Sequence, residues 1–334
     1  MTTSTLPPLA MSMGDPAGVG PQITVDAWRA LKAEPAAAFY VIGNPSLYGA
    51  ACDVAEISSP AGAAAVFPGA LPVLPLGSLP QIVPGTPEPA AAGAIIAAIE
   101  TGVAHCLDGQ ASGLVTNPIN KALLYGAGFR HPGHTEFIAD LCAGATGSAM
   151  RPVMMLTGGG LRVALATIHQ SLASVPASLD TGRLVELGEI VHTALVKDFG
   201  IAEPRIAFTG LNPHAGEGGA MGREEIEIIN PAAELLRQRN IHMSDARPAD
   251  TVFAEALGGA FDAVVAMTHD QGLIPVKTLD LWGGVNMTLG LPIVRTSPDH
   301  GTGYDAAAAG KAHAGSLIAA VRAAASVARM RNAR

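Results

Sequence analysis

AVVAMTHDQGLIPVKTLDLWGGVNMTLGLPIVRTSPDHGTGYD, residues 263–305, is the stretch around which the rest of the chain is organised. It opens with an uninterrupted apolar run, residues 263–267, which predicts a buried strand. That strand would place His269 and Asp270 at its carboxyl end, the edge at which open α/β sheets collect their functional groups. A lysine, an asparagine, an arginine and a second histidine follow within the same stretch. We therefore expect a site here, to which upstream segments contribute further groups.

Apolar runs and helical patterns alternate along the whole chain. Strands are predicted at residues 9–13, 39–42, 71–76, 113–116, 154–156, 163–167 and 205–208. Helical spacing lies between most of them, and an Ala-rich segment predicts one uninterrupted helix over residues 305–330. This alternation predicts an α/β protein with a mostly parallel sheet. A chain of 334 residues accommodates one large domain or two medium domains.

The composition argues against several classes of protein. A formal net charge of −8, scattered basic residues and only 4% aromatic residues disfavour a nucleic-acid-binding surface. Apolar runs are interrupted by Pro, Gly or a charge before they reach membrane-spanning length, and the N-terminus lacks a signal-peptide pattern. We therefore expect a cytoplasmic protein with no membrane partner. Three widely spaced cysteines fit reduced thiols better than a disulfide framework.

His169, His214 and His269 each follow a separate predicted strand. Because parallel strands place their carboxyl ends on one side of a sheet, the three imidazoles are candidates for one site. Three histidines with open positions for water or substrate are typical of catalytic zinc and similar divalent ions. Their spacing is long-range and forms no local motif, so the alternative is that each histidine is a hydrogen-bonded loop residue.

Lys277, Asn286 and Arg295 form a second candidate cluster, with His134 and Thr135 upstream in GHTEF. Lysine and arginine together suit a substrate that carries phosphate or carboxylate groups, since Arg binds such groups through a planar fork and Lys as a point charge. Surface salt bridges are the alternative. Apolar flanks such as LGLPIV argue against full solvent exposure of these residues.

Phosphate and dinucleotide motifs are weak in this chain. The segment HGTGYDA, residues 300–306, formally matches G-x-G-x-x-A, but it lies near the C-terminus before a final helix. A dinucleotide fingerprint instead follows the first strand of a βαβ unit, so a Rossmann domain is not expected. The Gly-rich turn GDPAGVGP, residues 14–21, is read equally as an anion-binding helix start and as a tight turn without a ligand.

Several longer motifs carry a resemblance to a known family. MGDPAGVGP, GHTEF, LNPHAGEGG, PADTVF, HDQGLIPVK and VNMTLGLPIVRTSPDHGT occur in the order seen in 4-hydroxythreonine-4-phosphate dehydrogenases, and the match covers nearly the whole chain. The resemblance implies a homodimeric, NAD-dependent enzyme of pyridoxal phosphate biosynthesis. It also implies a fold similar to isocitrate and isopropylmalate dehydrogenases, with two α/β/α subdomains around a cleft. We place the first subdomain at residues 1–130 plus 301–334 and the second, with the metal ligands and the dimer interface, at residues 131–300.

The resemblance also assigns roles to residues in matching motifs. It implies ligands for a divalent metal (zinc, magnesium or cobalt) at the dimer interface, namely His169, His214 and His269. It implies substrate contacts at His134, Thr135, Lys277, Asn286 and Arg295, of which His134 and Lys277 are the candidates for proton transfer. Because HGTGYD resembles the HGSAPD loop of isopropylmalate dehydrogenases, it implies NAD or NADP contacts at His300, Gly301 and Asp305. The chain departs from the family pattern at Gln22, where Glu is common, at Thr268, where Tyr is common, and in AAAAG after Asp305.

The expected reaction is the oxidation of 4-phosphooxy-L-threonine to 2-amino-3-oxo-4-phosphooxybutanoate, which decarboxylates to 3-amino-2-oxopropyl phosphate. A related dehydrogenase that acts on threonate 4-phosphate or on a dihydrodiol carboxylate is the nearest alternative. HDQGL, with Leu273, favours the biosynthetic reaction. A phosphate-site acyltransferase of similar architecture and a non-catalytic phosphometabolite-binding protein are alternatives of other classes, and the three histidines argue against the acyltransferase.

Overall fold

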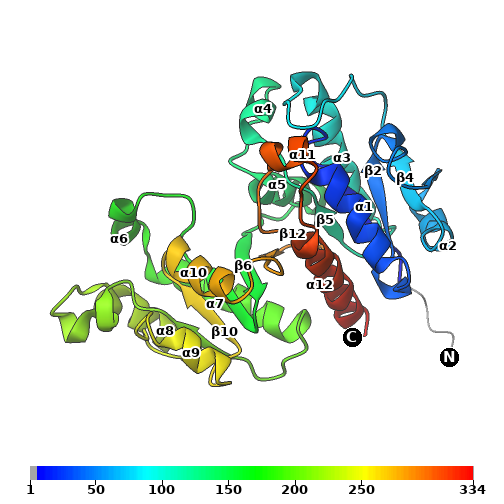
Figure 1. Ribbon diagram of the computed structural model, residues 1–334. Coiled ribbons are helices and arrows are strands. Elements are labelled where there is room, and N and C mark those ends of the chain that lie inside the picture. Colours follow the sequence, from blue (N-terminus) through cyan, green and yellow to red (C-terminus); the bar gives the residue numbers. More distant parts are fainter. Residues whose placement is uncertain (1–5, 334) are drawn as a thin grey trace. The chain divides into compact units, whose positions relative to one another are not determined.

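The structure, a computed structural model, describes residues 6–333 and divides into two compact units (Figure 1). Unit 1 consists of the residues up to Pro152 together with those from Leu291 onward, and unit 2 of Val153–Gly290. The division differs from the expected boundaries at 130/131 and 300/301. The reason is packing: α5 (His134–Thr146) contacts α3 (Ala92–Leu107), and β12 (Arg295–Pro298) pairs with β5 (Leu114–Thr116), so both belong to unit 1.

Unit 1 contains a sheet whose strands all pair in parallel, in the order β3-β4-β2-β1-β5-β12. Its other strands are β1 (Leu9–Ser12), β2 (Phe39–Gly43), β3 (Val54–Glu56) and β4 (Leu71–Pro75). Its other helices are α1 (Gly20–Leu31), α2 (Ala63–Val66), α4 (Lys121–Gly126), α11 (Tyr304–Ala309) and α12 (Gly315–Asn332). Strands β1, β2, β5 and β12 are completely buried, as expected where helices cover a parallel sheet, whereas the edge strand β3 is half-buried to exposed.

Helices cover both faces of the unit 1 sheet. Side chains alternate along a strand, so Leu114 and Thr116 face one side and Val115 faces the other. Gly102 of α3 packs on Leu114, whereas Thr296, which is in register with Val115, bonds to Ala320 of α12. The segment Pro89–Leu107, which contains α3, has a mean hydropathy of 1.6 and is long enough to cross a membrane. It packs on β1, β2 and β5, as the core helix of a sheet protein does.

The single C-terminal helix expected over residues 305–330 is wrong. Two helices occupy this region, α11 and α12, and Gly310 ends the first of them. Gly310 has a φ of 62°, a left-handed conformation that stops an α-helix and that glycine adopts without steric cost. The Ala-rich composition on both sides concealed this helix end.

Unit 2 contains a mixed sheet in the order β11-β6-β7-β10-β8-β9. Strands β11 (Val285–Leu289), β6 (Val153–Gly158) and β7 (Leu161–Leu165) pair antiparallel, and β7, β10 (Ala263–Ala266), β8 (Arg205–Phe208) and β9 (His242–Met243) pair in parallel. Its helices are α6 (Val175–Ser178), α7 (Thr181–Lys197), α8 (Asn230–Gln238), α9 (Val252–Leu257) and α10 (His269–Leu279). A π-helical turn, η7 (Glu225–Ile229), leads into α8, and Pro231 lies in the first turn of α8.

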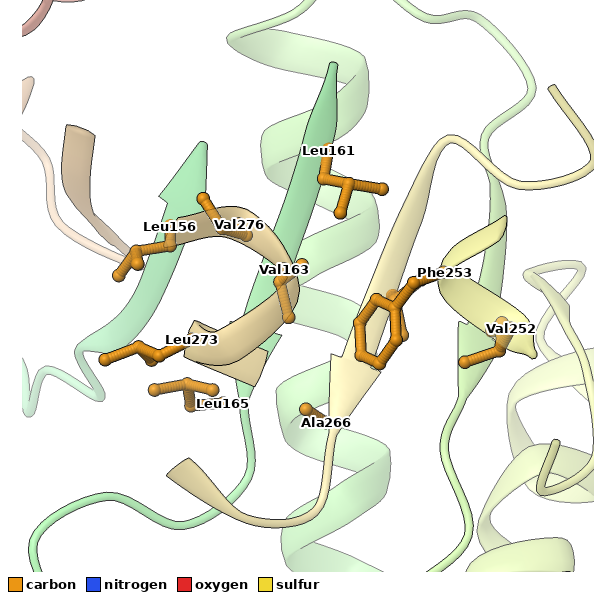
Figure 2. Packing of buried hydrophobic residues seen from close by; sticks show 11 residues of the cluster. Leu156, Leu161, Val163, Leu165, Val252, Phe253, Ala266, Leu273 and Val276 are labelled. Atoms are coloured by element: carbon orange, nitrogen blue, oxygen red, sulfur yellow. The ribbon is translucent and has the colours of Figure 1, made fainter. Parts of the chain in front are cut away.

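The core of unit 2 fixes α10 on the sheet. Leu273 and Val276 of α10 pack against Leu156, Val163 and neighbouring strand residues (Figure 2). These strand positions are in register across β6, β7 and β10, and therefore face the same side. Because α10 begins at His269, the packing of this helix also fixes where His269 lies. The α/β architecture expected from the sequence is confirmed in both units; the sheet of unit 1 is parallel and that of unit 2 is mixed.

Candidate functional site

Three neighbouring strands of unit 2 end at the same edge of the sheet, because β7 and β8 both pair in parallel with β10. A candidate histidine follows each of them: His169 lies four residues beyond β7, His269 is the first residue of α10, and His214 lies in the loop after β8. The three residues that the sequence suggested therefore leave adjacent strands.

Two of these histidines lie close together. The ring centroids of His169 and His269 are 5.8 Å apart. Both rings line a pocket of about 620 Å³, together with Thr167, Ser171 and Asp270 among others. Within residues 6–333, no three His, Cys, Asp or Glu side chains form a group that could hold a metal ion. One chain therefore brings His169 and His269 together and leaves His214 apart from them.

The surroundings of two histidines suit metal ligation. Nδ1 of His269 lies 2.8 Å from Oδ1 of Asp270, and Nδ1 of His214 lies 2.8 Å from Oε1 of Glu217. A carboxylate on Nδ1 favours the tautomer whose lone pair is on Nε2, the arrangement found around histidines that bind metals. The hydrogen bond that His214 donates to Glu217 also raises the pKa of His214. In both rings, this tautomer leaves the Nε2 lone pair available to bind a divalent ion.

Gln271 ties the loop after β8 to the start of α10. Its Oε1 accepts from the Thr268 backbone N and from Thr209 Oγ1, both at 3.2 Å, and its Nε2 donates to the Gly210 carbonyl at 3.0 Å. Thr268 in turn caps α10 and completes a capping box with Gln271. His269 is therefore held by hydrogen bonds that span residues 209–271.

The loop that carries His214 has an unusual backbone. Five consecutive residues, 214–218, have φ angles between 44° and 77°, which makes one turn of left-handed helix in η6 (Pro213–Gly219). Three of them are not glycine, and each such residue costs about 1–2 kcal/mol relative to the right-handed conformation. Other interactions must offset this cost. Glu225 makes several of them, because its carboxylate accepts from the backbone N of Leu211 and of Asn212, each at 2.8 Å.

Lys277 lies on α10, eight residues and about two turns beyond His269. His269, Leu273 and Lys277 line a second pocket of about 420 Å³ in unit 2. Asn286 on β11 is in register with Leu156, so its side chain faces the side of the sheet that α10 covers. Its Oδ1 is buried and accepts no hydrogen bond within the described part of the chain. These two expected substrate residues thus belong to the same layer of unit 2 as His269.

Arg295, His134 and Thr135 belong to unit 1. Arg295 is only 3% exposed, and its Nη2 donates to Thr116 Oγ1 at 2.8 Å. Both side chains face the α3 side of the sheet, because Arg295 is in register with Leu114 and Thr116 lies two residues further along β5. His134 is the first residue of α5, with the half-buried Thr135 beside it.

Two positively charged side chains, Arg295 and Lys121, lie near His134. Burial lowers the pKa of His134 well below its usual value of 6.5, and the charges of Arg295 and Lys121 lower it further, so the ring is neutral near pH 7. Burial lowers the pKa of Arg295 to about 10, which leaves this residue protonated. Nε2 of His134 is buried and has no hydrogen-bond partner among residues 6–333. The cluster can therefore attract an anion and offer it a neutral imidazole.

Two of the candidate cofactor residues lie in the loop before α11, and Asp305 lies in the first turn of that helix. His300, Gly301 and Asp305 are exposed, and Nδ1 of His300 lies 3.0 Å from the Gly301 carbonyl. This loop is attached to the Gly-rich turn, since the Val19 backbone N donates to the Thr302 carbonyl at 2.9 Å. A cleft of about 470 Å³ in unit 1 is lined by Gly18 of the Gly-rich turn and Ala307 of α11, among others. His300, Gly301 and Asp305 are not among the residues that line this cleft.

Tyr304 makes a second link between this loop and upstream motifs. Its hydroxyl donates to Asp15 Oδ2 at 2.5 Å and accepts from Asn120 Nδ2 at 3.0 Å. Burial and the bond to Asp15 raise the pKa of Tyr304 to about 12. Asp15 comes from GDPAGVGP and Asn120 from TNPINK, so three segments far apart in the sequence meet at one phenol.

The family described as pyridoxal phosphate biosynthetic protein PdxA matches residues 35–324. A protein of Caulobacter vibrioides is 55% identical over 328 residues, covering 97% of this chain and 98% of the relative. The chain belongs to the PdxA family. The Caulobacter relative and one from Maricaulis maris, 48% identical over 98% of this chain and 99% of its own length, are both named 4-hydroxythreonine-4-phosphate dehydrogenase.

Solved structures of PdxA proteins have the same fold. A 4-hydroxythreonine-4-phosphate dehydrogenase from Klebsiella pneumoniae has a TM-score of 0.84 at 34% identity, over 96% of this chain and 99% of that one. A terephthalate 1,2-cis-dihydrodiol dehydrogenase from Burkholderia xenovorans has a TM-score of 0.65 at 29% identity, over 96% and 98%. These similarities confirm the expected non-Rossmann α/β fold class.

Sequence reasoning missed several residues that organise this PdxA site. Gln271 was identifiable, because Thr268 followed three residues later by Gln is a capping-box pattern. Glu225 and Tyr304 had no such local signal. Their partners, Asn212 and Asp15, lie 13 and 289 residues away in the sequence.

Proposed function

We propose that this protein is an NAD-dependent, divalent-metal-dependent dehydrogenase of pyridoxal phosphate biosynthesis. The proposed reaction oxidises the C3 hydroxyl of 4-phosphooxy-L-threonine to the ketone of 2-amino-3-oxo-4-phosphooxybutanoate. The observation that carries this proposal is the 55% identity, over nearly the full length of both chains, to a protein named 4-hydroxythreonine-4-phosphate dehydrogenase.

The proposed oxidation removes a hydride and a proton from the substrate. The C3 hydrogen leaves with its electron pair to the nicotinamide of NAD or NADP, and the hydroxyl proton leaves to a base or to solvent. A divalent ion held by His169, His214 and His269 would supply positive charge that stabilises the substrate oxygen. The resulting β-keto acid loses carbon dioxide, takes up a proton at the carbon that carried the carboxylate, and yields 3-amino-2-oxopropyl phosphate.

The unit 1 cluster supports a role in anion recognition. Arg295 remains protonated and is held by Thr116, so its guanidinium is oriented toward an anionic group of the substrate before binding. His134 is neutral and its Nε2 is unsatisfied within the described residues, so it can bond to the substrate or accept a proton. Thr135 is the neighbouring proposed substrate contact.

Lys277 and Asn286 are the proposed substrate contacts in unit 2. Lys277 shares a pocket with His269, so an ammonium group and a candidate metal ligand face the same space. Asn286 has a buried Oδ1 that a substrate hydroxyl or ammonium can satisfy. Lys277, like His134, is a candidate for proton transfer. We further propose that the partner copy of a homodimer completes the metal site, since one chain brings only His169 and His269 together.

A related dehydrogenase activity is the second candidate. The Burkholderia xenovorans structure is named for a cis-dihydrodiol of terephthalate, and its 29% identity covers 96% of this chain. A branched-chain phosphotransacylase from Enterococcus faecalis has a TM-score of 0.52 at 12% identity, which shows a shared fold alone. The acyltransferase alternative therefore has no support beyond architecture.

A spectrophotometric assay of NADH formation tests the proposal. Purified protein with added divalent metal is given 4-phosphooxy-L-threonine, threonate 4-phosphate or a cis-dihydrodiol carboxylate, with NAD and NADP compared. Turnover of 4-phosphooxy-L-threonine that is lost on chelation and restored by metal is expected. Faster turnover of either other substrate would replace the substrate assignment, and undiminished activity after chelation would refute the role of the metal.

A further inference from the structure

The carboxylate of Glu225 lies behind the left-handed turn that carries His214. Glu225 is 2% exposed, although its neighbours Ile226 and Glu227 are exposed. Each of its oxygens has a partner: Oε1 accepts from the Leu211 and Asn212 backbone N at 2.8 Å, and Oε2 accepts from Asn212 Nδ2 at 3.0 Å. A buried carboxylate is stable only with such donors, so the loop and Glu225 hold each other in place.

Close packing strengthens this attachment. A Cβ added at Gly216 would lie 2.7 Å from Glu225 Oε2, and one added at Gly222 would lie 2.3 Å from Asn212 Nδ2. A Cβ at Gly210 would lie 2.8 Å from Ala215 Cα. The left-handed turn thus fits against Glu225 and Asn212 only because glycines occupy these positions. Glu225 itself lies in a π-helical turn, a distortion that recurs at functional sites.

We propose that Glu225 is a positioning residue for metal binding: it fixes the backbone of Leu211 and Asn212, and thereby the left-handed turn of residues 214–218, so that His214 is presented for ligation. The proposal rests on the proposed role of His214 as a metal ligand. The His214 side chain is 60% exposed and its Nδ1 bonds to the Glu217 side chain of the same turn, so the turn itself sets the position of the imidazole. Loss of the carboxylate would leave the part-buried backbone N–H groups of Leu211 and Asn212 without their acceptor and release that backbone.

Titration of the purified protein with Co²⁺, followed by calorimetry and by the visible absorption of the bound ion, tests this proposal. Glu225→Ala is expected to weaken Co²⁺ binding roughly tenfold to a hundredfold, the usual effect of removing the hydrogen bonds that orient a metal ligand. Glu225→Gln keeps an oxygen acceptor for the backbone N–H groups and is expected to recover part of the affinity. Glu227→Gln is the control, because Glu227 loses the same charge two residues away while its side chain is 58% exposed.

A pair of glycine variants provides an independent test that leaves Glu225 intact. Gly216→Ala and Gly218→Ala both place a side chain in the left-handed region, at φ angles of 77° and 66°. Only the first meets Glu225, because nothing lies within 4 Å of a Cβ at Gly218. Gly216→Ala is therefore expected to weaken Co²⁺ binding and to speed amide exchange in residues 211–219 more than Gly218→Ala does. Equal effects of the two variants would show that backbone strain alone matters and would overturn the proposal.

His214→Ala separates failure of this proposal from failure of the proposed function. Weak Co²⁺ binding by His214→Ala together with wild-type binding by Glu225→Ala would overturn the positioning role and leave the metal site standing. Wild-type binding by His214→Ala would refute the ligand role, and the positioning role with it. Thermal unfolding of each variant, without metal, identifies any that lose the fold, in which case the glycine pair decides.

Discussion

His134 and Arg295 show how burial decides the state of single residues. Both are ordinary charged or titratable side chains in the sequence, yet in unit 1 the pKa of His134 falls well below 6.5 while that of Arg295 falls only to about 10. A pKa below 6.5 leaves histidine neutral near pH 7, whereas a pKa of about 10 leaves arginine charged. The neutral imidazole beside a fixed cation is the arrangement that the proposed anion recognition requires.

The depressed pKa of His134 predicts how stability depends on pH. The folded protein binds fewer protons at His134 than the unfolded chain does wherever the pH lies between the depressed pKa and 6.5. Stability contributed by the neutral ring is therefore complete above 6.5 and is lost as the pH falls below it. Urea unfolding between about pH 5 and pH 8 should show a smaller loss of stability for His134→Gln than for the wild type. Parallel profiles for the two proteins would contradict the shift.

Arg295→Lys should weaken substrate binding without unfolding the protein. Lysine keeps the positive charge but lacks the planar fork, so one charge-assisted hydrogen bond is lost. The expected rise in KM for the phosphorylated substrate is roughly tenfold to a hundredfold, with the KM for NAD little changed. Arg322→Lys is the matched control, because Arg322 pairs with Glu34 at the surface, 2.6 Å away. An unchanged substrate KM in Arg295→Lys would remove this residue from the binding site.

At the scale of elements, α10 connects the core of unit 2 to the candidate site. Leu273 and Val276 pack against the strands (Figure 2), and Leu273 also lines a pocket together with His269 and Lys277. Its first turn is held by Thr268 and Gln271, whose bonds reach the ends of β8 and β10. Packing fixes the axis of the helix, and these polar bonds fix its starting point.

Gln271→Ala should destabilise this connection. The change removes the capping box and the bond to the Gly210 carbonyl, and we expect a loss of about 1–2 kcal/mol in the free energy of unfolding, measured with urea. Gln238→Ala, in the last turn of α8, is the comparison. Among residues 6–333 the Gln238 side chain bonds to the exposed Glu234 alone, at 3.3 Å, so its loss should change stability little. Similar losses in the two variants would mean that the hydrogen bonds of Gln271 contribute no more to the free energy of unfolding than the exposed bond of Gln238.

At the scale of the whole molecule, two units carry different parts of the proposed chemistry. The three histidines, Lys277 and Asn286 belong to unit 2, and His134, Thr135, Arg295 and the candidate cofactor loop belong to unit 1. Within one chain only His169 and His269 approach each other. In the proposed homodimer, the partner chain would supply the missing ligand.

Mixed dimers test this proposal. His214→Ala and His269→Ala should each abolish NADH formation when pure. If these two ligands come from different chains, a dimer with one chain of each kind contains one intact metal site and one that lacks both. Exchange of subunits at equal concentrations should then restore roughly a quarter of the wild-type activity, since half of the dimers are mixed. No recovery despite proven subunit exchange would place both ligands in one chain.

The sequence by itself determined most of the elements and the candidate residues. Apolar runs predicted β1, β2, β4 and β10, because burial on both faces leaves a continuous signal in neighbouring residues. Strands β11 and β12 were not predicted, since polar residues such as Asn286 and Arg295 interrupt their pattern. The alanines around Gly310 likewise concealed the end of α11.

Only the tertiary structure decided which of these residues meet. Three contacts join residues up to 179 positions apart in the sequence. His169 lies near His269, Arg295 donates a hydrogen bond to Thr116, and Glu225 accepts hydrogen bonds from the loop that leads into the left-handed turn. Periodicity and capping patterns report neighbours within a few positions, whereas burial, pKa and the geometry of a site depend on contacts that form when distant segments pack. Residue types at strand ends are therefore readable from sequence, and their arrangement is not.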